Sequence, residues 1–171
     1  MRISEFYYYR GYFNRNSYIN LMLLKLCEYN NWANSLLLNT LSEAAEKHAA
    51  PIPDYCIKLL SHIANTQGIW TSRIHGTVPG LSVWQEHDLD TCRSLLAETG
   101  NELKDIVKND SAKDRIVKYK ISTGAIFETS INDILFHVFN HGTYHRAQIA
   151  KEMKDNGLQP ANTDYIQFVR S

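Results

Sequence analysis

The sequence has few cysteines, no excess of charge of either sign and no long apolar run. Its cysteines, Cys27, Cys56 and Cys92, are far apart and form no CxxC pair, so neither a disulfide framework nor a thiolate metal site is expected. The 18 Lys and Arg residues balance the 18 Asp and Glu residues, which leaves no net field to attract nucleic acid or anionic lipid. The apolar stretch LMLLKLC contains Lys25 and is too short to span a bilayer. We therefore expect a cytoplasmic protein with no nucleic-acid or membrane partner.

The hydrophobic pattern of the chain is helical. With 171 residues, 44% hydrophobic and 21% charged, the sequence predicts one domain, residues 1–171, with a continuous core. Apolar residues recur at spacings of three and four in four segments, which predicts helices over about 19–42, 54–74, 89–107 and 130–155. Alternating apolar residues predict a small β-hairpin over about 114–129. Four helices with two longer connections describe an all-α four-helix bundle.

The last predicted helix has the clearest end signals. Ser130 followed by Asp133 resembles a capping box, and the acid lies favourably in the first helical turn. Asn156 and Gly157 supply a stop. The tail from Leu158 onwards is predicted to lie extended over the bundle.

Three histidines, His137, His141 and His145, follow one another at intervals of four in the stretch HVFNHGTYHRAQIAKEM. On an α-helix, side chains four residues apart reach one point, which suits two nitrogen ligands about 2.1 Å from the same ion. Residues eight apart are separated by about 12 Å along the axis, so His137 and His145 are not expected to share an ion. At most one adjacent pair binds a metal. A hydrogen-bonded polar seam accounts for the same spacing and, on spacing alone, is the commoner outcome.

The apolar stripe of this helix distinguishes between the two pairs. Ile134 and Ile149 mark the inward face, and positions 141 and 145 lie on the same line. His137 lies further round the helix. We therefore favour His141 with His145 as candidate metal ligands and treat His137 as a flanking group.

A third ligand has to come from another helix, and His62 is the candidate. It lies on the predicted inward face of the second helix, in line with Leu59. The other histidines are in or near loops, where solvent exposure is the ordinary state: His48, His75 and His87. Three converging imidazoles would leave a fourth position for water or substrate, as in catalytic metal sites. Their ring nitrogens are then expected within about 3–4 Å of one another.

Three stretches of the sequence together carry a resemblance to a known family. They are EYNNWANSLLLNTL in the first predicted helix, LLSHIANTQGIWTSRIHG in the second and HVFNHGTYHRAQI in the last. In this order they resemble the DinB/YfiT-like family of metal-binding four-helix proteins. The resemblance covers about residues 22–170 and leaves a tyrosine-rich N-terminal extension, residues 1–21, outside it. Because that extension carries many aromatic residues, we predict that it packs on the bundle or on a second subunit.

The resemblance implies a divalent metal ion bound by His62, His141 and His145, with the open position facing a cavity. Zn or Ni is the first expectation, with Fe, Co, Cu and Mn as alternatives. The resemblance also implies an up-up-down-down bundle with a long crossover, often as a homodimer. Family members of known activity are metal-dependent thiol transferases and isomerases that use thiols such as bacillithiol or mycothiol. This implies transfer of a small-molecule thiol to a small electrophile, and a non-catalytic metal-binding stress or damage-response protein is the alternative.

Residues around the candidate site each admit two roles. Arg73 and Arg146 suit a carboxylate on the substrate or an interhelical or surface salt bridge. Asn140 or Gln148 is placed to orient an imidazole through its second nitrogen. Core packing is expected of Trp32 and Trp70.

Overall fold

The computed structural model describes residues 15–47, 51–109, 115–121 and 123–171. In chain order its elements are α2 (Arg15–Lys47), α3 (Asp54–His75), α4 (Leu89–Lys108), β1 (Ile116–Lys120), β2 (Ile126–Ser130), α5 (Ile131–Asp155) and α6 (Tyr165–Arg170). The long helices and the antiparallel β1–β2 hairpin confirm the predicted all-α bundle with a hairpin before its last long helix. Among the described residues, no helix is both long and apolar enough to cross a membrane. The predicted packing of the tyrosine-rich extension concerns Phe6 to Phe13, which lie outside the described residues.

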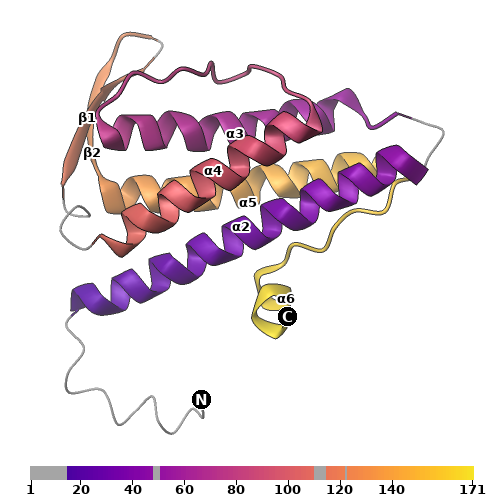
Figure 1. Cartoon of the computed structure of the whole chain (residues 1–171), viewed down its shortest axis with the longest axis horizontal. Coiled ribbons are helices and arrows are strands. Elements are labelled where there is room, and N and C mark those ends of the chain that lie inside the picture. Colours follow the sequence, from indigo (N-terminus) through magenta and orange to yellow (C-terminus); the bar gives the residue numbers. More distant parts are fainter. Residues whose placement is uncertain (1–14, 48–50, 110–114, 122) are drawn as a thin grey trace, which may run out of the picture.

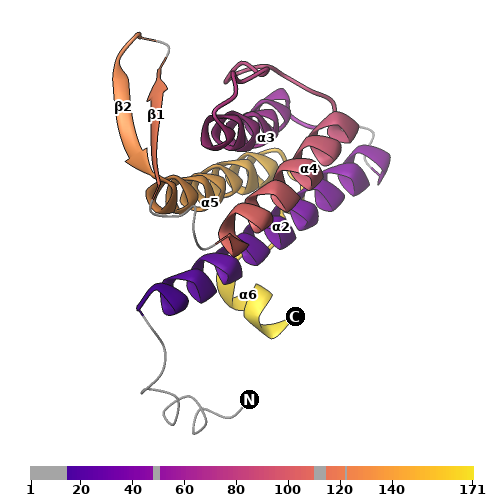
Figure 2. The same ribbon diagram turned by 60° about the vertical axis from the view of Figure 1, so that its left-hand side comes forward.

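The four long helices form the bundle in two layers, one of α2 with α4 and the other of α3 with α5. Both α2 and α3 pack against α4 and α5, so the latter two helices separate α2 from α3 (Figures 1 and 2). The strands pair from Ile116 opposite Ser130 to Lys120 opposite Ile126, at the end of the bundle where α5 begins. Because α3 packs against α5, the two helices that carry the candidate ligands are direct neighbours.

The direction of the helices differs from the predicted order. Figure 1 shows α2 and α5 running one way and α3 and α4 the other, so the chain travels up-down-down-up in place of up-up-down-down. The short link between Lys47 and Asp54 joins helices that run in opposite directions, as short connections do. Residues 76–88, here called the crossover segment, are long enough at about 3.3 Å per residue to return along the whole of α3. The predicted long crossover therefore lies between α3 and α4.

Both ends of α5 follow from local sequence signals. Ser130 Oγ accepts a hydrogen bond from the backbone N–H of Asp133 at 3.1 Å, which confirms the predicted cap. At the other end Gly157 has φ 75°, and the N–H of Leu158 reaches back to the carbonyl of Met153 at 2.9 Å. This is the glycine-terminated helix end that Asn156 and Gly157 predict.

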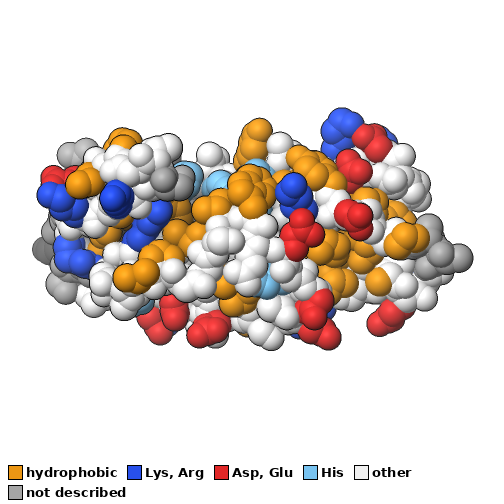
Figure 3. Space-filling view, turned by 90° about the horizontal axis from the view of Figure 1, so that it is seen from above, with side chains coloured by type: hydrophobic (Ala, Val, Ile, Leu, Met, Phe, Trp, Pro, Cys, Tyr) orange, Lys and Arg blue, Asp and Glu red, His pale blue; other side chains and the backbone are white. Residues whose placement is uncertain are grey.

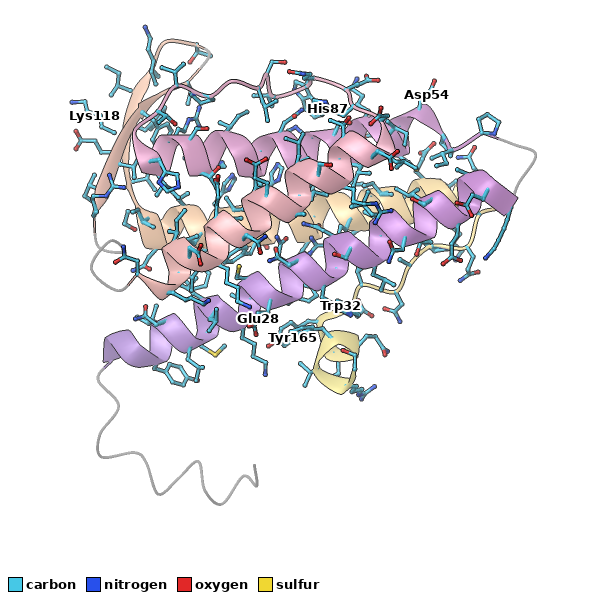
Figure 4. The ribbon with its side chains drawn as sticks, viewed as in Figure 1. Glu28, Trp32, Asp54, His87, Lys118 and Tyr165 are labelled. Carbon is cyan, nitrogen blue, oxygen red and sulfur yellow. The ribbon has the colours of Figure 1, made fainter. Side chains whose placement is uncertain are left out.

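The C-terminal tail is not extended throughout, because its last residues form α6. Tyr165 and Phe168, three residues apart, share one face of this helix and pack against Tyr29 and Trp32 of α2 (Figure 4). The hydroxyl of Tyr29 also donates a hydrogen bond to the carbonyl of Thr163 at 2.8 Å. The tail therefore covers the outer side of α2 with an aromatic cluster.

The core consists of two apolar clusters separated by a layer of buried polar side chains. One cluster includes Leu41, Leu60, Ile149 and Met153; the other includes Leu23, Leu103, Ile134 and Leu135. Between them along each helix lie Asn30 and Asn34 of α2, Asn65 and Gln67 of α3, Thr99 of α4, and His145 and Arg146 of α5. We call this set the mid-bundle polar layer. Hydrogen bonds between these side chains, such as those of Arg146 with Asn30 and Asn34, link helices at this level of the bundle.

Candidate metal centre

Three histidines from two facing helices meet beside the mid-bundle polar layer, to which one of them, His145, belongs. Nε2 of His62 on α3 lies 3.0 Å from Nε2 of His141 on α5. One ring nitrogen each from His62, His141 and His145 falls within 4.8 Å of the others, and in the described part of the chain no other group of three or more His, Cys, Asp or Glu does so. The spread is wider than the expected 3–4 Å because His62 and His141 contact each other directly while the third nitrogen lies further away. This group is called the histidine triad below.

The second nitrogens of two triad rings are held by oxygen acceptors. Nδ1 of His62 lies 3.0 Å from the carbonyl oxygen of Val83, and Nδ1 of His145 lies 2.7 Å from Oε1 of Gln148. An amide oxygen only accepts hydrogen bonds, so each Nδ1 carries the proton and each Nε2 keeps its lone pair for the centre. Gln148 thus takes the orienting role predicted for it or Asn140, and Asn140 is exposed.

Burial favours the neutral form of two triad histidines, His141 and His62. Burial, together with the smaller effect of the neighbouring imidazoles of His145, His62 and His137, lowers the pKa of His141 to about 3. Burial also lowers the pKa of His62, against the opposing effect of its hydrogen bond to Val83. Neutral imidazole is the form that binds a metal ion, so these rings need lose no proton at neutral pH to become ligands.

Two exposed aromatic rings flank the triad. Trp84 of the crossover segment stacks on His62, with centroids 3.9 Å apart and planes at 9°, and it remains 53% exposed. Tyr144 lies edge-on to His145 at 5.0 Å and is 61% exposed. Seen from the side of the crossover segment, histidine side chains reach the surface among hydrophobic ones (Figure 3). The triad therefore has an apolar rim that faces solvent.

His137 lies outside the triad, as the apolar stripe of α5 predicts. Its ring packs edge-on against Trp70, with centroids 5.5 Å apart. Arg73 does not project freely toward a substrate, because its guanidinium lies over the rings of Trp70 and Tyr119 at 4.6 and 4.8 Å. Trp70 is partly buried against the apolar cluster near β1, as expected of a packing residue.

The loop histidines divide into exposed and bound ones. His75 is exposed, as predicted, and His48 lies outside the described residues. The prediction of a solvated side chain is wrong for His87, which is half-buried. Figure 4 labels His87, and its Nε2 lies 2.8 Å from Oδ1 of the fully buried Asn65. The cause is tertiary: the crossover segment returns along α3 and brings His87 onto this helix.

Arg146 has neither of the roles that its position in the sequence suggests. It is 1% exposed, and its guanidinium donates hydrogen bonds to Oδ1 of Asn30 at 3.0 Å, to Oδ1 of Asn34 at 2.8 Å and to Oγ1 of Thr143 at 3.0 Å. No carboxylate of the described residues forms a salt bridge with it. A side chain at Gly142 would lie only 2.7 Å from Oδ1 of Asn30, so this helix contact depends on glycine. Arg146 therefore joins α5 to α2 inside the polar layer.

Sequence reasoning missed the residues that the crossover segment brings to the triad. They are the Val83 carbonyl and the Trp84 ring, together with Asn65, which binds the segment. The one available signal was the pair Val83-Trp84, two large apolar residues in a stretch of turn-forming and polar ones. Nothing in the local sequence says which helix such a loop will cover.

The fold and the histidine triad define a class of protein, an all-α bundle with a candidate metal centre in its interior. The DinB family model matches residues 15–171, from the first residue of α2 onwards, and the chain belongs to this family. The chain is also similar to Protein DinB of Bacillus subtilis (strain 168). The two are 23% identical over 154 residues, which cover 82% of this chain and 90% of that protein.

Proposed function

We propose that the protein is a metal-dependent thiol S-transferase that joins a low-molecular-weight thiol to a small electrophile. In this proposal His62, His141 and His145 hold one divalent ion. The observation that carries it is the meeting of these rings, with Nε2 of His62 3.0 Å from Nε2 of His141 and one nitrogen of all three within 4.8 Å. Membership of the DinB family supports the proposal, since the resemblance to that family implies thiol-transfer chemistry.

The donor set fits a divalent transition metal. Neutral imidazoles suit Zn, Ni, Fe, Co and Cu, and we expect Zn or Ni first. A set of three protein ligands leaves room for a substrate atom, as in catalytic zinc sites. A bound dication would supply Lewis acidity that lowers the pKa of a thiol at the site. Val83 and Gln148 hold the rings of His62 and His145 in the orientation that such binding requires.

The cysteines of the chain are unsuited to supplying the reacting thiol. Cys27, Cys56 and Cys92 are all fully buried. Burial raises the pKa of Cys27 to about 12 and that of Cys56 to about 11, and it also raises the pKa of Cys92. The thiolate is the nucleophilic form, so these thiols are inert at neutral pH. A separate small thiol therefore suits the site.

The aromatic rim suits an electrophile with an apolar part. Trp84 and Tyr144 keep about half or more of their surface exposed beside the triad, at 53% and 61%. Exposed rings next to buried polar groups are typical of ligand sites. In the proposal these two side chains bind the apolar part of the electrophile, and the triad side binds the thiol.

A thiol-conjugation assay tests the proposal. Protein purified without an affinity tag is loaded with Zn²⁺ or Ni²⁺ and mixed with glutathione, cysteine or bacillithiol and an electrophilic dye that changes absorbance on conjugation. We expect thiol-dependent turnover that a chelator abolishes and that added metal restores. His145→Ala should lose it, whereas the matched variant His137→Ala should retain it.

The same experiment separates the proposal from the non-catalytic alternative. Stoichiometric metal that is lost in His145→Ala, without acceleration of conjugation for any of these thiols, would identify a metal-binding protein that is not a transferase. Metal-independent conjugation would remove the triad from the mechanism.

A further inference from the structure

The crossover segment contacts the triad ligand His62 through two of its residues and the neighbouring Ser61 through a third. The carbonyl of Val83 binds Nδ1 of His62 at 3.0 Å. The indole of Trp84 covers one face of the same imidazole at a centroid distance of 3.9 Å. The backbone N–H of His87 donates a hydrogen bond to Oγ of Ser61, the residue before His62, at 3.0 Å. The position of the His62 ring therefore depends on where this segment lies.

Asn65 is the side chain that binds this segment most extensively. It is fully buried, one helical turn after His62. Its Nδ2 donates to the carbonyl of Gln85 at 2.6 Å and to the carbonyl of Val83 at 3.5 Å. Its Oδ1 accepts from Nε2 of His87 at 2.8 Å. The amide thus contacts the same Val83 oxygen that orients the His62 imidazole.

Apolar burial contributes little to holding residues 83–87 in place, whereas Leu81, earlier in the segment, is partly buried close to Gly68 of α3. Val83 and Trp84 are 43% and 53% exposed, and Gln85 is also exposed. None of residues 83–87 is buried, so this part of the segment keeps its position through hydrogen bonds to the scaffold. Here those bonds converge on Asn65 and Ser61.

We propose that Asn65 is a positioning residue of the candidate metal centre. By fixing residues 83–87 over α3, it places the Val83 carbonyl and the Trp84 ring that together orient His62. This inference rests on the metal binding in the proposed function but not on thiol transfer. Partners that orient a ligand through its second nitrogen typically contribute about 10–100-fold to metal affinity.

The test compares two buried amides on α3. Asn65→Leu keeps the size of the side chain but removes its hydrogen bonds to the crossover segment. The matched control Gln67→Met removes a buried amide that bonds to Thr99 of α4 instead. Zn²⁺ affinity is measured by competition with a chromophoric chelator, on proteins whose folded state is checked by circular dichroism. We expect about 10–100-fold weaker binding for Asn65→Leu and wild-type affinity for Gln67→Met.

A double-mutant cycle distinguishes positioning through the segment from a general loss of stability. His87→Ala removes one of the bonds to Asn65 and should weaken Zn²⁺ binding by itself. In the Asn65→Leu background the same change should have no further effect, because the contact is already absent. Fully additive losses would overturn the inference, as would an Asn65→Leu variant with wild-type affinity.

A measurement on the metal-free protein tests the positioning role of Asn65 even if the wild-type protein binds no Zn²⁺. Long-range ¹H–¹⁵N spectra of the apo protein report which nitrogen of His62 carries the proton. We expect the Nδ1–H form in the wild type and in Gln67→Met, and loss of that preference in Asn65→Leu. An unchanged His62 tautomer in Asn65→Leu would contradict the positioning role. Absence of Zn²⁺ binding by the wild type would instead refute the proposed metal site.

Discussion

The indole of Trp84 lies face to face with the imidazole of His62, at a centroid distance of 3.9 Å and an angle of 9° between the planes. One ring comes from a loop and the other from the middle of α3. The stacked imidazole is itself a member of the histidine triad. The environment of the Trp84 indole therefore depends directly on the state of the candidate metal centre.

This stack predicts a fluorescence response to metal. Binding of Ni²⁺ or Cu²⁺ at the triad should quench the emission of Trp84, since the ion would lie against the ring on which the indole stacks. Trp84→Leu should lose most of the quenching. The control is Trp32→Leu, which removes an indole packed against Phe168 on the outer side of α2 and should preserve the response. Equal quenching in both variants would place the ion elsewhere.

The histidines of α5 should differ sharply in their effect on metal content. His145→Ala is expected to abolish stoichiometric metal, because it removes one of three ligands. His137→Ala should leave most of the metal bound, since the ring of His137 contacts Trp70 instead of joining the triad. Elemental analysis of untagged protein after incubation with Zn²⁺ and desalting gives the ratio. The opposite ranking would contradict the assignment.

The lowered pKa values predict acid sensitivity of the metal-free protein. The pKa of His141 is about 3 in the folded state against an ordinary value of 6.5, and that of His62 is also lowered. Between those two pH values the unfolded chain binds protons that the folded chain does not. The free energy of unfolding should therefore fall as pH decreases from 6.5 towards 3, with no such contribution above 6.5. Urea unfolding in the presence of a chelator, at several pH values, measures the slope.

His141→Gln is the matched variant for this dependence. It removes the histidine whose folded-state pKa is about 3, so the stability of the variant should fall less steeply with acid. A slope equal to that of the wild type would assign the acid sensitivity to other groups.

Gly142→Ala should destabilise the fold. The added Cβ would lie 2.7 Å from Oδ1 of Asn30 and 2.8 Å from Nη1 of Arg146, and both groups are buried. Overpacking of this kind costs about 1–3 kcal/mol, measured as a lower urea midpoint. Gly80→Ala is the control, because nothing lies within 4 Å of its added Cβ; surface changes of this type stay within about 0.5 kcal/mol. Similar midpoints for the two variants would show that α2 and α5 separate easily.

Local sequence signals were sufficient for the helices and for much of the triad. The four-residue spacing of the histidines and the apolar stripe through Ile134 and Ile149 select His141 and His145. The three- and four-residue periodicity places His62 on an inward face, and Ser130 marks the start of α5. Each of these is a property of one helix, which periodicity and capping chemistry describe.

The surroundings of the triad could not be predicted in this way, because they depend on contacts between distant segments. Arg146 is a charged residue on a helix, for which exposure is the ordinary state, yet it is buried against Asn30 and Asn34. His87 lies in a loop that returns along α3 to reach Asn65. The path of a loop and the partner of a buried cation are decided by the assembled bundle.

The hydrogen bonds between Arg146 and α2 also favour one position of α5 along its own axis relative to α2. Histidines spaced by four residues make the triad ambiguous: sliding α5 by four residues, about 6 Å, would put His137 and His141 where His141 and His145 now lie. The same movement would put Gly142 in the place of Arg146 and leave the buried Oδ1 atoms of two α2 asparagines without a donor, at a cost of about 1–3 kcal/mol each. Arg146 thus acts together with the apolar stripe of α5 in selecting which two of the three histidines face α3.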